Sequence, residues 1–177
     1  TVITSTDISK GHQLSSSDFD VAFLQAFKWQ DGKLLLIVYH DAFLGHDVYE
    51  WISGVIYGMQ VAGAEWKNTL AYRLSTEMGF KEVKNMQSMY YHPEKKLTVP
   101  CHVDDPLCKS ENEEGRKWFH GTLDELFDTK DGKILSPTQA LHYLSIRIST
   151  NDKGDIMLDN QVKIEEYLEQ AGLTDAN

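Results

Sequence analysis

The most regular alternation of apolar and polar positions covers residues 63–78. Apolar side chains recur there at every fourth position, which places them on one face of an α-helix. Gly79 follows at the point where a helix commonly ends, because glycine adopts the left-handed conformation without strain. The pattern predicts a helix from Gly63 to Met78 with a buried stripe of Trp66, Leu70, Leu74 and Met78.

Two further helices are predicted from amphipathic patterns in the second half of the chain. Ser110 and Glu113 have the spacing of a capping box, which predicts a helix that begins there and runs to about Phe127. The last helix is predicted over residues 162–171, with Gly172 at its end. The residues expected to face the core are Phe119, Leu123 and Leu126 in the first, and Ile164, Tyr167, Leu168 and Ala171 in the second.

Short runs of aromatic and β-branched residues between turn signals predict strands. Residues 34–39 form a wholly apolar run, which is typical of a buried strand. Further strands are predicted at 86–92, 97–103, 141–149 and 156–158. Strands and helices therefore mix without regular βαβ alternation, and this favours an α+β domain with a mostly antiparallel sheet.

The beginning of the chain has a different character. Residues 1–17 are mostly polar and predict a frayed start followed by a loop. The next segment begins polar and becomes apolar. It predicts a strand that ends near Asp18–Asp20, followed by a turn or short helix that carries Ala22, Phe23 and Leu24.

Composition narrows the class of protein. The chain has 177 residues, of which 41% are hydrophobic and 25% charged, as in one globular domain with a sizeable core. Its formal net charge of −10 argues against nucleic-acid binding, which needs basic side chains to neutralise phosphates. Only two cysteines occur, and we find no signal-peptide pattern or membrane-spanning run. These features predict an intracellular protein that is not secreted, and a chain beginning with Thr1 predicts a piece of a longer product.

The candidate chemistry lies in residues 99–107, where Asp104 and Asp105 stand side by side in a mostly apolar run. The pattern predicts strand, tight turn and strand, with the carboxylates at the tip. Adjacent carboxylates repel each other, and a cation between them removes that cost. A solvated Asp-Asp turn is the simpler interpretation of this pair taken alone.

Three segments in order then carry a resemblance to a known family. Residues 18–25, DFDVAFLQ, resemble the D-x-x-x-A-F-L-N segment of copia-type retrotransposon reverse transcriptases. Residues 57–66, YGMQVAGAEW, resemble their Y-G-L-K-Q-A-P-x-x-W segment, and residues 102–105, HVDD, resemble their Y-V-D-D box. Residues 141–148 and 162–173 resemble a later strand and helix of the same family.

The resemblance implies a polymerase palm at residues 1–158 without the fingers, and the start of a thumb or connection helix at 159–177. Its sheet would be mostly antiparallel, with the helices packed on one face. The implied activity is RNA-directed DNA synthesis on a nucleic-acid primer-template from deoxynucleoside triphosphates, with two Mg²⁺ or Mn²⁺ ions. With the fingers absent and an acidic surface, we expect little primer extension from this stretch alone.

The same resemblance implies roles for individual residues. Asp18 and Asp104 would be the bridging metal ligands with Asp105 beside them, and Mg²⁺ prefers such hard oxygen ligands. The backbone carbonyl of Phe19 would be a further ligand. Phe23 would crowd the sugar 2′ position and favour deoxynucleotides, although an ordinary core role is the alternative for this side chain. Among the implied substrate-binding residues is Gln60, which stands one place before the family's Gln.

The sequence also departs from the family pattern. Val61 replaces the Gln, Gly63 replaces the Pro, and His102 replaces the Tyr of the box. Pro100 and Pro106 flank the box, where strands should pair and proline cannot donate a hydrogen bond. These departures keep a second hypothesis open, in which the chain is an inactive retroelement remnant that folds as an acidic α+β domain with a binding role only.

Two registers are possible for the predicted hairpin. A loop of Asp104 and Asp105 would make Cys101 face Cys108, whereas a loop of Val103 and Asp104, as the resemblance implies, makes Cys101 face Pro106. The second register is favoured, because it places Pro106 in a non-hydrogen-bonded pair. It predicts strain at Val103, since such turns need positive φ and a β-branched residue resists it. A zinc site formed by Cys101, His102, Cys108 and His120 fits no usual ligand spacing.

Overall fold

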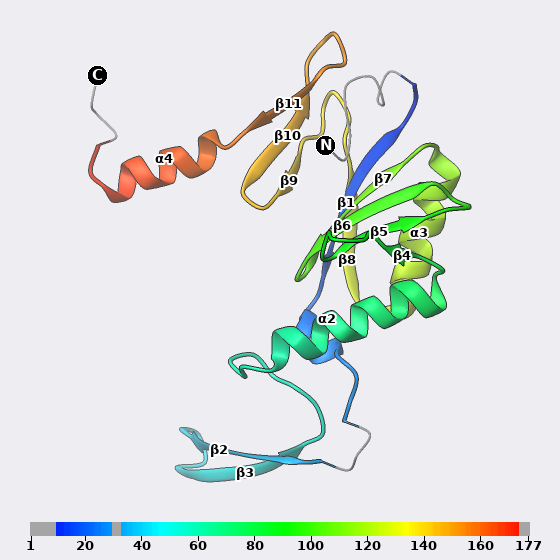
Figure 1. Ribbon diagram of the computed structural model, residues 1–177. Helices are drawn as coiled ribbons and strands as arrows, with labels where there is room; N and C mark the ends of the chain where they lie inside the picture. The colour runs from blue at the N-terminus through cyan, green and yellow to red at the C-terminus, as the bar shows by residue number, and fades with distance from the viewer. Residues whose placement is uncertain (1–9, 30–32, 174–177) are drawn as a thin grey trace.

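A six-stranded antiparallel sheet organises the computed structural model, which describes residues 10–29 and 33–173 (Figure 1). The strand order is β4-β5-β6-β7-β1-β8, so β1 lies in the interior of the sheet although it comes first in the chain. Neighbouring strands pair antiparallel throughout. The strands are β1 (Gln13–Phe19), β4 (Lys81–Glu82), β5 (Met89–His92), β6 (Leu97–His102), β7 (Asp105–Ser110) and β8 (Thr129–Ile134).

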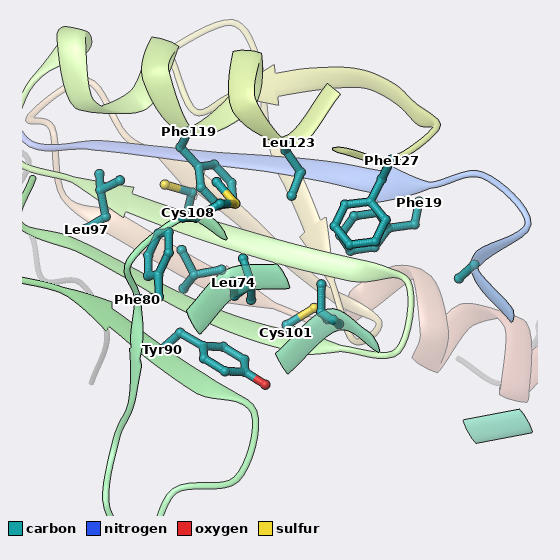
Figure 2. Packing of buried hydrophobic residues seen from close by; sticks show 14 of the residues in the cluster. Phe19, Leu74, Phe80, Tyr90, Leu97, Cys101, Cys108, Phe119, Leu123 and Phe127 are labelled. Carbon is teal, nitrogen blue, oxygen red and sulfur yellow. The ribbon is translucent and has the colours of Figure 1, made fainter. Parts of the chain in front are cut away.

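Two helices cover one face of this sheet. The first is α2 (Ala62–Tyr72), which continues as a π-helical turn, η2 (Arg73–Glu77), and the second is α3 (Glu113–Leu126). Their apolar faces meet the sheet in one core cluster, part of which Figure 2 shows between the α3 and β6–β7 ribbons. The predicted stripe is buried as expected, with relative exposures of 1% for Trp66, 5% for Leu70, 1% for Leu74 and 3% for Met78.

The opposite face of the sheet carries a smaller antiparallel sheet of three strands. It consists of β9 (Leu141–Tyr143), β10 (Ile146–Thr150) and β11 (Ile156–Asp159). Leu141 and Ile148 pack there against Leu14 and Leu107 of the main sheet. The single strand predicted over 141–149 was wrong: Leu144 and Ser145 have φ of 51° and 65° and turn the chain between β9 and β10.

Two elements extend away from the main sheet (Figure 1). The hairpin of β2 (Leu35–Asp41) and β3 (His46–Ile52) contains the predicted strand, but no side chain of β2 is buried, so the prediction of a buried strand was wrong. The 3₁₀ turn η1 (Ala22–Gln25) follows β1 as predicted. The last helix, α4 (Gln161–Gln170), forms where predicted. The face predicted to be inward is nevertheless exposed, at 48% for Ile164 and 59% for Tyr167.

The predicted fold class is confirmed: the chain is α+β, its sheets are antiparallel, and α2 and α3 share one face. Two local predictions need correction. The N-cap of α3 is Asn112, whose Oδ1 accepts from Gly115 N at 2.8 Å, rather than Ser110. The polar residues 13–17 form strand β1 and not a loop. Within the described residues, none of the helices is long and apolar enough to cross a membrane.

Candidate active site

The end of β1 and the turn between β6 and β7 lie side by side. The Phe19 backbone N–H donates to the Asp104 carbonyl at 2.9 Å, and β1 pairs with β7 as far as Ser16 opposite Leu107. Successive residues of a strand face opposite sides, so Asp18 faces the same side as Leu14, away from the helices. The fold therefore brings the two acid-bearing segments of the sequence to one edge of the sheet.

The turn has the register that the sequence favoured. Cys101 pairs with Pro106 and His102 with Asp105, which leaves Val103 and Asp104 as the two loop residues. The Cys101 N–H donates to the Ser88 carbonyl at 2.9 Å, on the β5 side of β6. The pair with Pro106 is therefore not hydrogen-bonded, so the missing proline N–H removes no hydrogen bond between β6 and β7. The predicted strain is also present, because Val103 has a φ of 51°.

A cavity of about 200 Å³ lies on the β9 side of these acids. Asp18 and Asp105 both line it. The other lining residues come from three strands and are Ser16, Ser17, Lys133, His142 and Tyr143. Burial raises the pKa of Tyr143 to about 12, so its hydroxyl stays protonated at neutral pH. None of these five residues was predicted to belong to the site, since only the folded arrangement of the strands brings them to the acids.

The charges around the acids are unevenly balanced. Burial raises the pKa of Asp105 above its usual value, and the nearby charges of Asp104 and Asp18 raise it further. Asp18 is instead paired, because Lys130 Nζ lies 3.1 Å from its Oδ2 and 3.3 Å from Asp20 Oδ1. Asp18 and Lys130 are directly opposite each other on β1 and β8. One ammonium therefore balances two carboxylates, while Asp104 and Asp105 repel each other.

The three acids have the hard oxygen chemistry that Mg²⁺ prefers. Their arrangement is not a ready-made metal centre, however. In the part of the chain that the structure describes, no group of three or more His, Cys, Asp and Glu side chains is placed to hold a metal ion. The four residues of the candidate zinc set form no such group either. His120 instead bonds the hydroxyls of Ser15 and Ser17, at 2.8 Å from each ring nitrogen.

The implied substrate-binding residues occupy three different settings. Phe19 is 2% exposed, and its ring belongs to the core. Its N–H points to the β7 side, and because the N–H and carbonyl of one strand residue point the same way, its carbonyl is directed toward the turn as well. Phe23 is partly buried and packs on Tyr57, with ring centroids 4.8 Å apart. Gln60 lies exposed in the turn before α2. Their roles in substrate binding stay predictions.

Comparison of the sequence with known protein families shows to which family this α+β chain belongs. A family model described as reverse transcriptase (RNA-dependent DNA polymerase) matches residues 11–177. The chain belongs to the reverse transcriptase family. A search of curated proteins finds no match. The antiparallel sheet with helices on one face is consistent with a fragment of the polymerase palm of a reverse transcriptase.

The raised pKa of Asp105 predicts a pH-dependent effect of Asp105→Asn. A carboxyl whose pKa is higher in the folded state stabilises the fold at acid pH and loses that contribution as pH rises through the folded-state pKa. Asp105→Asn is therefore expected to stabilise this reverse transcriptase chain at pH 7 by less than about 1 kcal/mol, because solvent screens the partly exposed group. The gain should vanish near pH 3.

Urea unfolding of the wild type and of Asp105→Asn at pH 3, 5 and 7 measures this difference. Asp152→Asn, in an exposed turn, is the matched control, because it makes the same change of side chain away from the other acids. A gain for Asp105→Asn that is the same at pH 3 and pH 7 would contradict the raised pKa of Asp105.

Proposed function

We propose that this chain is the palm of a copia-type RNA-directed DNA polymerase, which transfers deoxynucleotides to a primer 3′ end. The observation that carries the proposal is the hydrogen bond between Phe19 N and the Asp104 carbonyl, which joins the two acid-bearing segments at one sheet edge. The resemblance had paired the same two segments from motif order alone. The proposed partners are a primer-template and a deoxynucleoside triphosphate, and the proposed context is a retrotransposon Pol polyprotein.

Asp18, Asp104 and Asp105 are the residues proposed to hold two Mg²⁺ or Mn²⁺ ions, with the Phe19 carbonyl as a further ligand. Bound ions of this kind neutralise charge on the attacking and leaving oxygens of an in-line displacement at phosphorus. The protein would hold the carboxylates in place, because β1 and the β6–β7 turn that carry them belong to the main sheet. Lys130 competes with a cation for Asp18, since it lies 3.1 Å from the carboxylate that a metal would use.

Two substrate contacts belong to the proposal. Phe23 packs on Tyr57 at the C-terminal end of β1, close along the chain to Asp18, and there it would exclude a ribose 2′-hydroxyl. Gln60 precedes α2 in an exposed turn and would contact the substrate. We also propose that residues 1–158 are the palm and that 159–177 begin a thumb. The buried free thiols of Cys101 and Cys108 support an intracellular, reducing location.

An inactive remnant with only a binding role is the second candidate. Two observations favour it: the net charge of −10, and the absence of an assembled group of metal-ligating side chains among residues 10–29 and 33–173. Such a remnant would keep the fold, because α2, α3 and the sheet bury the same core whether or not the carboxylates bind metal. The two candidates therefore differ in what the acids bind and not in stability.

Binding of Mn²⁺ with and without dATP separates the two candidates. Phosphate oxygens complete the shell of an ion that few protein ligands hold, so dATP is expected to tighten Mn²⁺ binding to the wild-type chain about tenfold. Electron paramagnetic resonance of free Mn²⁺ measures this after subtraction of Mn²⁺ bound by dATP alone. Asp104→Asn should abolish the effect, whereas Asp152→Asn should keep it. An equal response in wild type and Asp104→Asn would favour the remnant.

A further inference from the structure

One side chain contacts both segments that carry the acids. Trp66, in the first half of α2, donates its indole Nε1–H to the Val103 carbonyl at 2.7 Å. The tryptophan ring system also contacts Phe19 edge to face, with ring centroids 5.1 Å apart and an interplanar angle of 75°. Phe19 directly follows Asp18, and Val103 directly precedes Asp104. The tryptophan therefore bridges the two places where the chain presents its carboxylates.

Its surroundings hold this tryptophan firmly. Trp66 is 1% exposed, and Phe19 and Phe127 are 2% and 5% exposed. The three rings contact one another edge to face, with centroids 5.0 to 5.5 Å apart. Such aromatic pairs contribute beyond simple area burial and restrict the orientation of each ring. The indole N–H therefore has a fixed direction, and that direction is toward the turn.

The acceptor of the hydrogen bond is the strained residue of the turn. Val103 has a φ of 51°, a conformation that a β-branched residue adopts only when its surroundings impose it. The Cys101 thiol also approaches this carbonyl, but its Sγ lies 3.9 Å from the Val103 oxygen. A buried, fixed N–H donor supplies a much stronger interaction than a thiol at that distance. The indole is thus the main side-chain contact that favours the positive φ of Val103.

We propose that Trp66 is a positioning residue, which keeps the Val103–Asp104 turn in place against the end of β1. The backbone hydrogen bond from the Phe19 N–H to the Asp104 carbonyl forms only when the turn has this position. The assignment of the acids as metal ligands rests on the proposed function. The placement of the turn by Trp66 does not depend on it and can be tested without metal.

Native-state hydrogen exchange of single amides tests the placement. Trp66→Phe keeps an aromatic ring but removes the donor, so the Phe19 amide is expected to exchange at least about tenfold faster through local opening. The Leu135 amide, which donates to Leu14 at the other end of β1, is the internal reference and should change far less. Trp118→Phe is the matched control, because Trp118 packs against Phe80 and His92 instead.

The outcomes are distinct. Selective acceleration at Phe19 in Trp66→Phe alone supports the proposal, whereas equal acceleration at Phe19 and Leu135 means general destabilisation and overturns it. Unchanged exchange at Phe19 also overturns it. If Trp66→Phe does not fold, the wild-type chain decides: a scalar coupling across the hydrogen bond between Trp66 Nε1 and the Val103 carbonyl carbon is expected, and its absence overturns the proposal.

Metal affinity provides a readout that a purely structural tryptophan would not move. The dissociation constant for Mn²⁺ is expected to rise about tenfold in Trp66→Phe and to stay at the wild-type value in Trp118→Phe. Equal affinity in wild type and Trp66→Phe would overturn the positioning role. A wild-type chain without saturable Mn²⁺ binding would speak against the proposed function, while the exchange of the Phe19 amide would still decide the role of Trp66.

Discussion

Phe119→Ala is expected to lower the free energy of unfolding by about 3–5 kcal/mol. Phe119 lies on α3 with 0% exposure, between Phe80, 6.0 Å away by ring centroid, and the sheet. Its ring is among the buried side chains that join both helices to the sheet (Figure 2). Removing it leaves a cavity that a close-packed core cannot collapse to fill. A domain of this size has a stability of about 5–15 kcal/mol, so the loss is a large fraction of the total.

Urea unfolding followed by circular dichroism measures this effect as a lower midpoint with an unchanged slope. Phe43→Ala is the matched control, because Phe43 is fully exposed in the turn between β2 and β3. That variant should change the free energy of unfolding by less than about 0.5 kcal/mol. Similar losses for both variants would mean that the core does not join α3 to the sheet as described.

Helices and the acid-bearing turn could be predicted because their signals are local. The stripe from Trp66 to Met78 repeats at helical spacing, and Gly79, with a φ of 77°, ends the helix as expected. The register of the hairpin also followed from local chemistry, since only one of the two registers places Pro106 in a pair with β6 that uses no proline N–H. Positive φ at Val103 was a consequence of that choice.

The serine-rich part of β1 and the whole of β8 could not be predicted, because tertiary contacts stabilise them, although the end of β1 near Asp18 was predicted. The serines of β1 look like a loop by composition, yet Ser15 and Ser17 are buried and bond the two ring nitrogens of His120. The Asp-Gly pair in β8 is typical of a turn. Gly132 is instead needed in a strand, because a Cβ there would lie 3.0 Å from the His120 ring. Each of these strands makes sense only once α3 is packed over them.

Dependence on tertiary contacts also explains why the ion pair of Lys130 at the site was not predicted. Lys130 meets Asp18 only because β8 pairs with β1 at that register, although the two residues are 112 positions apart in the sequence. The bridge by Trp66 was hidden for a different reason. Its place in the helical stripe identified it as a core residue, which it is, but periodicity says nothing about where an indole N–H points. Side-chain direction came from the fold.

Divalent metal is expected to raise the melting temperature of the wild-type chain. The acids Asp18, Asp104 and Asp105 lie at one sheet edge, and the pKa of Asp105 is raised partly by the other two. An ion that binds the folded state adds RT ln(1 + [L]/Kd), about 2.7 kcal/mol at a hundredfold excess over Kd. Few protein ligands hold Mg²⁺ without phosphate, so the effect should appear at millimolar metal, with Mn²⁺ at least as effective.

Asp104→Asn separates a specific site from general screening. It removes one carboxylate but keeps the backbone carbonyl that accepts from Phe19, so the turn itself should persist. Without metal the variant should melt higher than wild type, because repulsion of Asp105 is relieved. Its response to metal should be lost. Because the net charge is −10, any divalent ion also screens the surface charges. Asp152→Asn measures the response due to this screening, since it makes the same charge change in an exposed turn far along the chain from the acids. If Asp104→Asn and Asp152→Asn respond equally to metal, the ion acts on the general surface, and the acids of this reverse transcriptase chain are then a remnant of its chemistry.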